Sequence, residues 1–256
     1  MENSSRLLCI GVPGIPQVQT GDDVAALVAQ GLRRLGESIE EGDVLVVAQK
    51  IVSKAEGRWV YLPDVSPSQE ALALAQKAQK DPRLVELILQ ESNAVLRVRP
   101  GLIIVEHRLG FVCANAGIDH SNVKGHEDWV LLLPRDPDAS ARALRKAWQR
   151  MFGVQNVAVI INDSHGRAWR LGTVGVAIGV AGMIPITDRR GEPDLLGRTL
   201  QVTVVGTADE LAAAASAVMG QGAEGIPVVL IRGARYRAGE GRLRDLLRPR
   251  ELDLFR

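Results

Sequence analysis

The chain has 256 residues, of which 46% are hydrophobic and 24% are charged, so its apolar content is sufficient for a substantial folded core. Its net charge of +1 provides no basic field that would attract nucleic acid. No apolar run approaches the roughly 20 residues that a membrane-spanning helix needs, and no signal sequence is recognisable. We therefore expect a cytoplasmic protein with no nucleic-acid and no membrane partner, whose two cysteines, Cys9 and Cys113, are reduced and buried.

In the first half of the chain, apolar runs alternate with helix-start signals. Short apolar, β-branched runs predict strands, and apolar residues spaced by three and four predict helices. Ser or Asp followed by Pro is typical of a helix start, because the side chain accepts a bond from a free backbone amide and proline fits the first turn. The expected elements are a strand at 7–11, a helix that starts at residues 21–23 and carries apolar residues from Val24 to Leu35, a buried strand at 44–48, and helices that begin at Ser66 and at Asp81.

The second half combines hairpin-like elements with alternating ones. The expected elements are paired strands at 102–106 and 111–114, helices at 140–152 and 208–219, strands at 157–161, 200–205 and 226–232, and a charged surface helix at 242–256. This mixture predicts an α+β (mixed α/β) fold, with mixed or largely antiparallel sheets and flanking helices. Residues 1–256 are expected to form either a single domain or two interleaved subdomains.

Two aspartates stand where predicted strands end. Asp119 closes the sequence Asn-Ala-Gly-Ile-Asp after the strand at 111–114, and Asp163 follows the strand at 157–161. Carboxylates in such positions suit Mg²⁺ or Mn²⁺, which would bridge the phosphates of a nucleotide. The alternative for each residue is an ordinary turn or helix-cap role.

Polar residues follow Asp163 at once. Ser164 could add an oxygen ligand, and Arg167 and Arg170 could hold a carboxylate or phosphate of the substrate through forked hydrogen bonds. The alternative is an exposed basic turn. No chemistry is assigned to His165, because a histidine in such a segment is more often a polar loop residue than a base.

Two glycine-containing loops are candidates for phosphate contact. One spans residues 12–16 after the first strand, and the other spans residues 219–227 after the alanine-rich helix. Glycine lets backbone amides approach phosphate closely, but neither loop is a Walker sequence or a dinucleotide fingerprint. Lys54 is either a phosphate-binding point charge or a solvated surface lysine.

Several uncommon strings occur in one order across almost the whole chain. They are Val-Pro-Gly-Ile-Pro, Gly-Asp-Val-Leu-Val-Val, Ile-Val-Ser-Lys-Ala-Glu-Gly-Arg, Asn-Ala-Gly-Ile-Asp-His-Ser-Asn-Val, Val-Ile-Ile-Asn-Asp-Ser-His-Gly-Arg, Gly-Val-Ala-Ile-Gly, Asp-Leu-Leu-Gly-Arg and Met-Gly-Gln-Gly-Ala-Glu-Gly-Ile-Pro. Together they resemble the coenzyme F420-0:L-glutamate ligase family. The resemblance covers a ligase domain only, so no fused reductase domain is expected.

The resemblance implies a GTP-dependent ligase. GTP would phosphorylate a carboxylate of the deazaflavin coenzyme precursor, the amine of L-glutamate would attack the acyl phosphate, and a second cycle would add a γ-linked glutamate. A divalent cation, Mg²⁺ or Mn²⁺, would offset the charge of the polyanions. The resemblance also implies a homodimer, with K⁺ as an additional cation.

Site residues follow from the matched motifs. The resemblance implies catalytic and metal-binding roles for Asp119 and Asp163, further metal contacts at Ser164 and Gln221, and substrate contact at Asn122. The nucleotide-contacting residues would be Pro13, Gly14, Ile15, Pro16, Gln49, Lys50 and Lys54, with Met219, Gly220, Gln221, Gly222, Ala223, Glu224, Gly225 and Ile226.

Gln221 departs from the family pattern, because similar archaeal ligases carry a metal-linked glutamate there. An amide oxygen can still bind a cation but adds no charge, and Glu224 lies nearby in the sequence. Two alternatives stay open. One is a related acid–amine ligase with a different acceptor, because the acceptor pocket has no sequence signature, and the other is a nucleotide-binding module without catalysis, in which Gln221 would mark the loss of activity.

Overall fold

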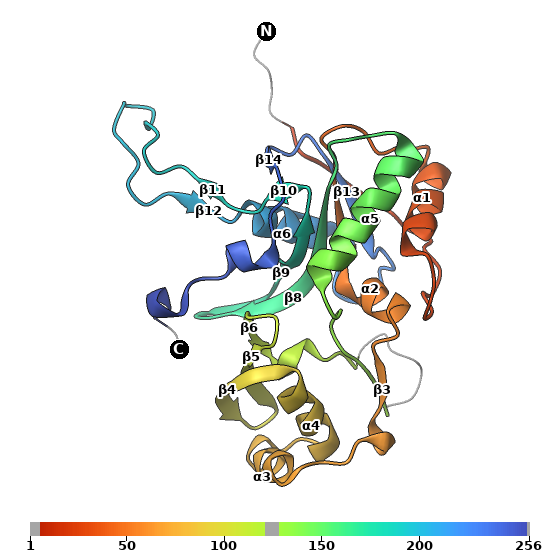
Figure 1. Cartoon of the computed structure of the whole chain (residues 1–256), viewed down its shortest axis with the longest axis vertical. Coiled ribbons are helices and arrows are strands. Elements are labelled where there is room, and N and C mark those ends of the chain that lie inside the picture. The colour runs from red at the N-terminus through yellow and green to blue at the C-terminus, as the bar shows by residue number, and fades with distance from the viewer. Residues whose placement is uncertain (1–5, 121–127, 255–256) are drawn as a thin grey trace.

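A five-stranded sheet forms the centre of the molecule (Figure 1). The computed structural model describes residues 6–120 and 128–254. The strand order is β1-β13-β2-β8-β9, and each neighbouring pair is antiparallel except the parallel pair β2 and β8. These strands are β1 (Leu8–Gly11), β2 (Val44–Ala48), β8 (Ala158–Arg167), β9 (Arg170–Ala181) and β13 (Val228–Arg232).

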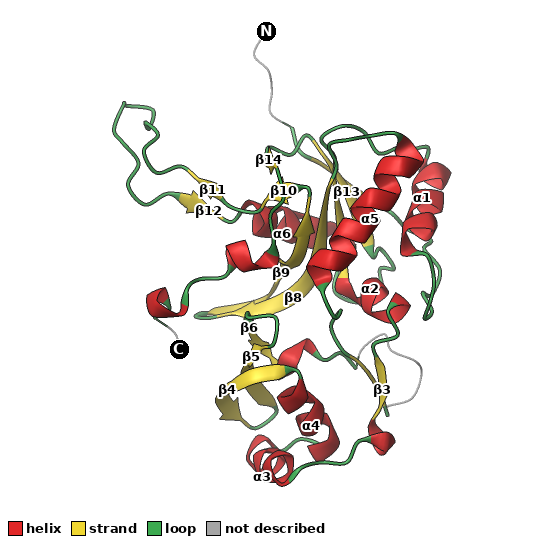
Figure 2. Ribbon diagram, viewed as in Figure 1, coloured by secondary structure: helices red, strands yellow, loops and turns green. Residues whose placement is uncertain are grey.

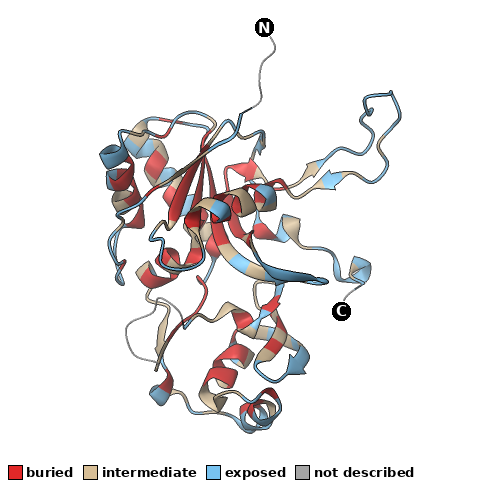
Figure 3. Ribbon diagram, turned by 180° about the vertical axis from the view of Figure 1, so that it is seen from behind, coloured by how far each residue is buried: buried red, intermediate tan, exposed pale blue. Residues whose placement is uncertain are grey.

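Side-chain alternation gives the sheet two buried faces. Val44 and Val46 of β2 belong to the cluster covered by α6 (Thr207–Met219), whereas Leu45 and Val47 belong to the larger cluster on the other face. That second face is covered by α1 (Val24–Leu35) and α5 (Pro137–Phe152). Figure 3 shows the central strands as buried throughout their middle portions.

Local sequence signals fix the ends of the long helices. Asp23 caps α1 by accepting a bond from Ala26 N, and Asp136 caps α5 by accepting one from Ala139 N. Gly36 and Gly153 end these helices in the left-handed conformation that glycine adopts readily. The two helices are joined where Trp148 Nε1 donates to Ala25 O at 3.1 Å.

A smaller group of elements packs beside the end of the sheet, in the lower half of Figure 2. Its three-stranded antiparallel sheet has the order β4-β5-β6 and is backed by α4. Ile88 and Ile103 from this group belong to the same apolar cluster as Leu45 of the central sheet. The elements are α3 (Gln69–Ala78), α4 (Pro82–Gln90), β4 (Ser92–Arg99), β5 (Leu102–His107) and β6 (Val112–Ala114).

The two parts are connected by α2 (Gln49–Ala55) and by a short ladder of β3 (Trp59–Tyr61) with β7 (Trp129–Leu131). Two arms leave the central sheet: the outer ends of β8 and β9, and a hairpin made by β11 (Thr187–Asp188) and β12 (Val204–Val205) (Figure 1). A further short pair joins β10 (Met183–Ile184) to β14 (Arg237–Ala238). In the described part of the chain, no helix is long and apolar enough to cross a membrane.

The predicted α+β class, with mixed and largely antiparallel sheets, is confirmed. Several expected elements differ from those of the structure in their bounds or type. The helix expected from Ser66 begins after Ser68, whose side chain accepts from Ala71 N, and β12 covers only the last residues of the strand expected at 200–205. Residues 242–254 form two short 3-10 turns, Leu243–Leu246 and Arg250–Leu252, instead of the expected helix.

Candidate active site

The strand order gathers the predicted site segments at one edge of the central sheet. Strands β1 and β2 end there, β13 begins there, and β8 passes this edge at Asn162, so the segments attached to these strands lie side by side. The strand pairs at this edge are Gly11 with Val229, Val47 with Val228, and Ala48 with Asn162. Residues 12–16, 49–54, 163 and 219–226 are therefore neighbours in space, although more than 200 residues of sequence separate the first from the last.

Asp119 reaches this edge through a left-handed turn. Asn115, Ala116 and Gly117 have φ values of 50°, 53° and 64°. Asn115 is among the residue types that tolerate this conformation, and its Oδ1 accepts a bond from Ile103 N, which fastens the turn to β5. Asp119 then exchanges two backbone hydrogen bonds of 2.9 Å with Leu131 of β7.

The Asp119 carboxylate is held by the first turn of α2. Lys50 Nζ lies 2.6 Å from Oδ1, and Gln49 Nε2 donates to Oδ2 at 2.6 Å. Gln49 is buried and in turn accepts a bond from Ser53 Oγ at 3.0 Å. Burial raises the pKa of Asp119, the Lys50 charge opposes this, and the negative charge of Asp163 raises it further. The two predicted metal-binding aspartates are therefore close enough to interact electrostatically.

Asp163 lies inside β8 and not after it, which corrects the expected strand end at Ile161. It faces Val176 of β9, and its Oδ2 lies 3.0 Å from His165 Nε2. Burial, together with the negative charge of Asp163, raises the pKa of Cys113 to about 12, so that thiol is an inert core group as expected.

Lys54 is only 7% exposed, which excludes the surface-lysine alternative. Its Nζ is 3.5 Å from Gln17 Oε1 and 5.8 Å from the centre of the Trp59 ring. Burial lowers the pKa of Lys54, the nearby Lys50 lowers it further, and Asp119 raises it. A buried amine beside a second cation stabilises an added anion such as phosphate.

The two glycine loops differ in how they are held. Gly14 has a φ of 71°, and its carbonyl accepts a bond from Arg34 Nη2 at 2.8 Å. In the second loop the Glu224 carboxylate accepts a bond from Gly222 N at 2.8 Å and lies against Gly220. Backbone hydrogen bonds lower the pKa of Glu224. Glu224 is thus used to shape its own loop, and Gln221 is an exposed residue of that loop.

Other predicted residues are placed differently. Ser164 stands between Asp163 and His165 in a regular strand, so alternation directs its side chain to the opposite face from theirs. Arg167 and Arg170 face each other at the tip of the β8–β9 arm, about 13 Å along the strand from Asp163. The metal role of Ser164 and the substrate role of both arginines stay predictions. Asn122 lies outside the described residues.

A divalent cation fits the donors at this edge. Two carboxylates, Asp119 and Asp163, come together with their charges only partly balanced, and Mg²⁺ is usually bound by one or two carboxylates with substrate phosphates as further ligands. Among the described residues, no group of three His, Cys, Asp or Glu side chains forms a preformed metal cluster. The remaining ligands would therefore have to come from substrate or water.

Reasoning from the sequence missed the contact of His165 with Asp163, because Asp163 was expected to follow its strand. A continuous strand over 158–167 would have placed residues 163 and 165 on one face. The contacts of Lys54 with Gln17 and Trp59 carried no signal in the sequence, since neither residue stands in a motif that predicted a site.

The fold and the site define an α+β protein with two acidic residues, two lysines and two glycine loops at one sheet edge. Within that class, the sequence model of the F420-0:gamma-glutamyl ligase family matches residues 14–233. The chain belongs to this family.

Three relatives align with most of the chain. A coenzyme F420:L-glutamate ligase of Methanothermobacter thermautotrophicus is 53% identical over 249 residues, which are 96% of this chain and 98% of the relative. One from Methanocaldococcus jannaschii is 49% identical over 85% of this chain and 86% of the relative. One from Methanopyrus kandleri is 46% identical over 96% of both chains.

Proposed function

We propose that this chain ligates L-glutamate to the deazaflavin coenzyme F420-0, using GTP and a divalent cation, and then adds a further γ-linked glutamate. The names of the relatives and of the family support the ligase activity and its two substrates. The observation that carries the proposal further is the meeting of Asp119, Asp163, Lys50 and Lys54 at the edge where both glycine loops lie.

The proposed reaction has two steps. A carboxylate oxygen of the acceptor attacks the γ-phosphorus of GTP, which forms an acyl phosphate and releases GDP. The glutamate amine then attacks the acyl carbon, the carbon–oxygen bond to phosphate breaks, and the amine nitrogen loses a proton as the amide forms. Without the first step the acceptor carboxylate is a poor acyl donor.

The residues of this edge suit those steps. Lys50 and Lys54 would bind phosphate oxygens through their positively charged amines. Lys50 is partly exposed and Lys54 is buried. The loops at 13–16 and 219–226 would approach the nucleotide through their backbones. Asp119 and Asp163 would hold Mg²⁺ or Mn²⁺, which would screen the charge of the phosphates during transfer.

Two further features are part of the proposal. A homodimer is supported by apolar side chains that protrude from both arms, since such residues are typical of an interface. A requirement for K⁺ follows from the family resemblance alone. Sedimentation measurements would test the dimer, and replacing K⁺ with Na⁺ in the assay would test the second cation.

Product mass tests the proposed function. Purified protein is incubated with F420-0, L-glutamate, Mn²⁺ and either GTP or ATP. We expect products enlarged by glutamate units with GTP, and none after removal of Mn²⁺ by a chelator. Equal turnover with ATP would overturn the nucleotide assignment. Product formed from other carboxylate acceptors and not from F420-0 would instead identify a related acid–amine ligase.

A further inference from the structure

His165 is in direct contact with one of the two acidic residues of the site. Its Nε2 lies 3.0 Å from Asp163 Oδ2, and only 12% of the His165 side chain and 13% of the Asp163 side chain are exposed. Both residues are on the same face of β8, two positions apart, so the strand itself sets their spacing. The contact is therefore a property of the folded strand and not of a mobile loop.

The imidazole of His165 packs against a row of buried rings. Its centre is 5.1 Å from the ring of Phe111, which stacks on the ring of His107 at 5.1 Å and 3°. His107 is fully buried and accepts a bond from Leu109 N through Nδ1. His107 belongs to β5 and Phe111 to the turn after it, so this part of the smaller sheet packs against the ring of His165.

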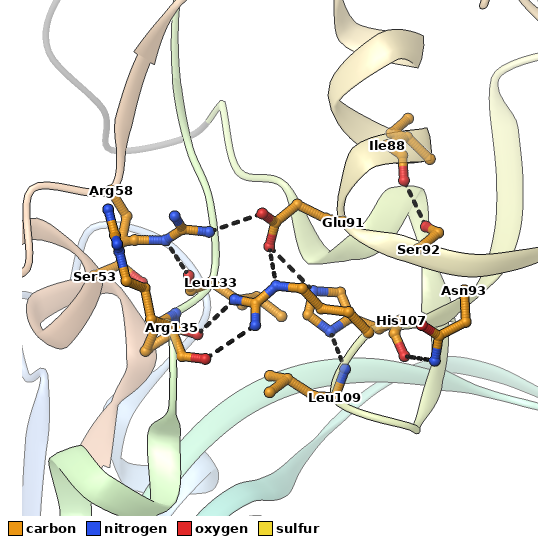
Figure 4. A network of polar contacts seen from close by, with 12 residues as sticks. Ser53, Arg58, Ile88, Glu91, Ser92, Asn93, His107, Leu109, Leu133 and Arg135 are labelled. Atoms are coloured by element: carbon orange, nitrogen blue, oxygen red, sulfur yellow. Dashed lines mark hydrogen bonds and ion pairs between the residues drawn. The ribbon is translucent and has the colours of Figure 1, made fainter.

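The row ends at a network of charges, shown in Figure 4. Glu91 accepts from Arg58 Nη2 at 2.9 Å and from Arg108 Nε at 2.8 Å, and His107 Nε2 lies 3.7 Å from its Oε2. Arg108 also donates to the carbonyl oxygens of Pro134 and Arg135. These contacts fix the position of His107 and, through Phe111, that of His165.

The chemistry of the two groups determines which one donates the hydrogen bond in the His165–Asp163 pair. An ionised carboxylate only accepts hydrogen bonds, so the imidazole Nε2 is the donor. One oxygen of Asp163 is then occupied by the histidine, and the other is left for a different partner. Carboxylates that bind metals are themselves commonly held by such outer hydrogen bonds.

We propose that His165 is a positioning residue that holds Asp163 Oδ2 and thereby presents Oδ1 as a single ligand to the divalent cation. The proposal rests on the proposed function, in that it assumes a cation at Asp119 and Asp163. In this role the imidazole orients the Asp163 carboxylate by donating a hydrogen bond, and it contacts neither the cation nor the substrate.

Two substitutions test separately the hydrogen bond that His165 donates and the packing of its ring. His165→Phe keeps an aromatic ring on Phe111 and removes the donor. His165→Gln removes the ring and retains an amide donor of similar reach. Asp163→Asn serves as the reference for loss of the site, and Arg189→Gln, in an exposed ion pair on the other arm, is a control distant in sequence.

The readout is Mn²⁺ binding to the purified full-length chain, measured by electron paramagnetic resonance of free Mn²⁺ with and without GDP. We expect His165→Phe to weaken Mn²⁺ binding about 10- to 100-fold, which is the usual effect of removing an outer hydrogen bond at a metal site. His165→Gln should recover most of that affinity. Melting temperatures should show that both variants are folded.

The results distinguish this inference from the proposed function. If Asp163→Asn abolishes Mn²⁺ binding and His165→Phe binds as wild type does, His165 does not position the aspartate. Equal loss in His165→Phe and His165→Gln would also overturn the proposal, because the imidazole would then be needed as more than a donor. Wild-type protein that binds no Mn²⁺ through Asp163 would overturn the metal site itself.

Discussion

Lys50 and Asp119 form an ion pair of 2.6 Å between the first turn of α2 and the turn that follows β6. The pair connects two segments that are 69 positions apart, and it places a cation directly beside one of the two candidate metal ligands. Both side chains remain about one-quarter exposed, so the pair is accessible from the solvent side of the site.

Lys50→Met should lower kcat/KM for GTP about 10- to 100-fold, because hydrogen bonds to charged groups contribute roughly 1.5–3 kcal/mol. Most of the loss should appear as a higher KM for GTP. Steady-state kinetics at saturating glutamate and acceptor measure this. Lys146→Met, at an exposed position of α5, is the matched control and should behave as wild type. Unchanged kinetics in Lys50→Met would remove Lys50 from the nucleotide site.

We expect Glu91 to make the stability of the fold sensitive to acid. Burial by itself would raise the pKa of Glu91, but contacts with His107 and Arg108 and the charge of Arg58 lower it from 4.5 to about 2. A carboxyl with a lowered folded-state pKa stabilises the fold above its unfolded value, and this contribution is lost as pH falls from about 4.5 towards 2. Glu91→Gln should therefore lose on the order of 3 kcal/mol at pH 7.

Denaturant unfolding at several pH values measures this effect. The free energy of unfolding of Glu91→Gln should vary less between pH 5 and pH 3 than that of wild type, according to the linkage between protonation and folding. Glu192→Gln, from an exposed ion pair, should leave both the stability and its pH dependence close to those of wild type. Parallel pH profiles for wild type and Glu91→Gln would show that Glu91 is not the group responsible.

Gly175→Ala should disturb both the fold and nucleotide binding. A Cβ at this position would lie against Ser216 Oγ, 2.5 Å from Ala212 O and 2.6 Å from Asn162 Oδ1, so α6 would have to shift. Overpacking of this kind costs about 1–3 kcal/mol. Because α6 ends in the loop at 219–226, KM for GTP should also rise. Thermal unfolding and kinetics test this against Gly166→Ala, where a Cβ meets no atom within 4 Å.

The sequence predicted the elements whose signals are local. The strand at 44–48 was predicted at the bounds seen here, and the helix that contains Val24 to Leu35 was predicted from its apolar face. A β-branched run and apolar residues spaced by three and four are sufficient to identify these elements. Residues 242–254 were predicted wrongly as a helix, because charged residues alone do not provide an apolar face to pack.

The site itself was predictable only in part. Asp119 and Asp163 were identified from motifs and strand-end positions, but their proximity depends on the strand order, which no local pattern encodes. The extension of β8 through Asp163 depends on pairing with β9, a tertiary interaction that overrides the polar character of residues 162–167. Burial of Lys54 likewise required the folded chain.

The proposed dimer depends on exposed apolar side chains of the two arms. Trp169 and Leu171 protrude at the tip of the β8–β9 arm, and Leu195 and Leu196 protrude from the other arm. Leu171→Asp combined with Leu195→Asp should shift the protein to monomer in sedimentation velocity, because charges at an interface core oppose association. Leu72→Asp, on α3 at the opposite end of the molecule in Figure 1, should not change the sedimentation coefficient. A monomeric wild type would contradict the dimer.

The most direct test of the central claim compares wild type with Asp163→Asn for glutamate addition to F420-0 by mass spectrometry, with GTP and Mn²⁺ present. The substitution preserves shape and removes one charge, so the melting temperature should change little. We predict that wild type yields glutamylated product and that Asp163→Asn yields essentially none. Glutamylated product formed by Asp163→Asn at the wild-type rate would contradict the proposed metal-dependent ligase site.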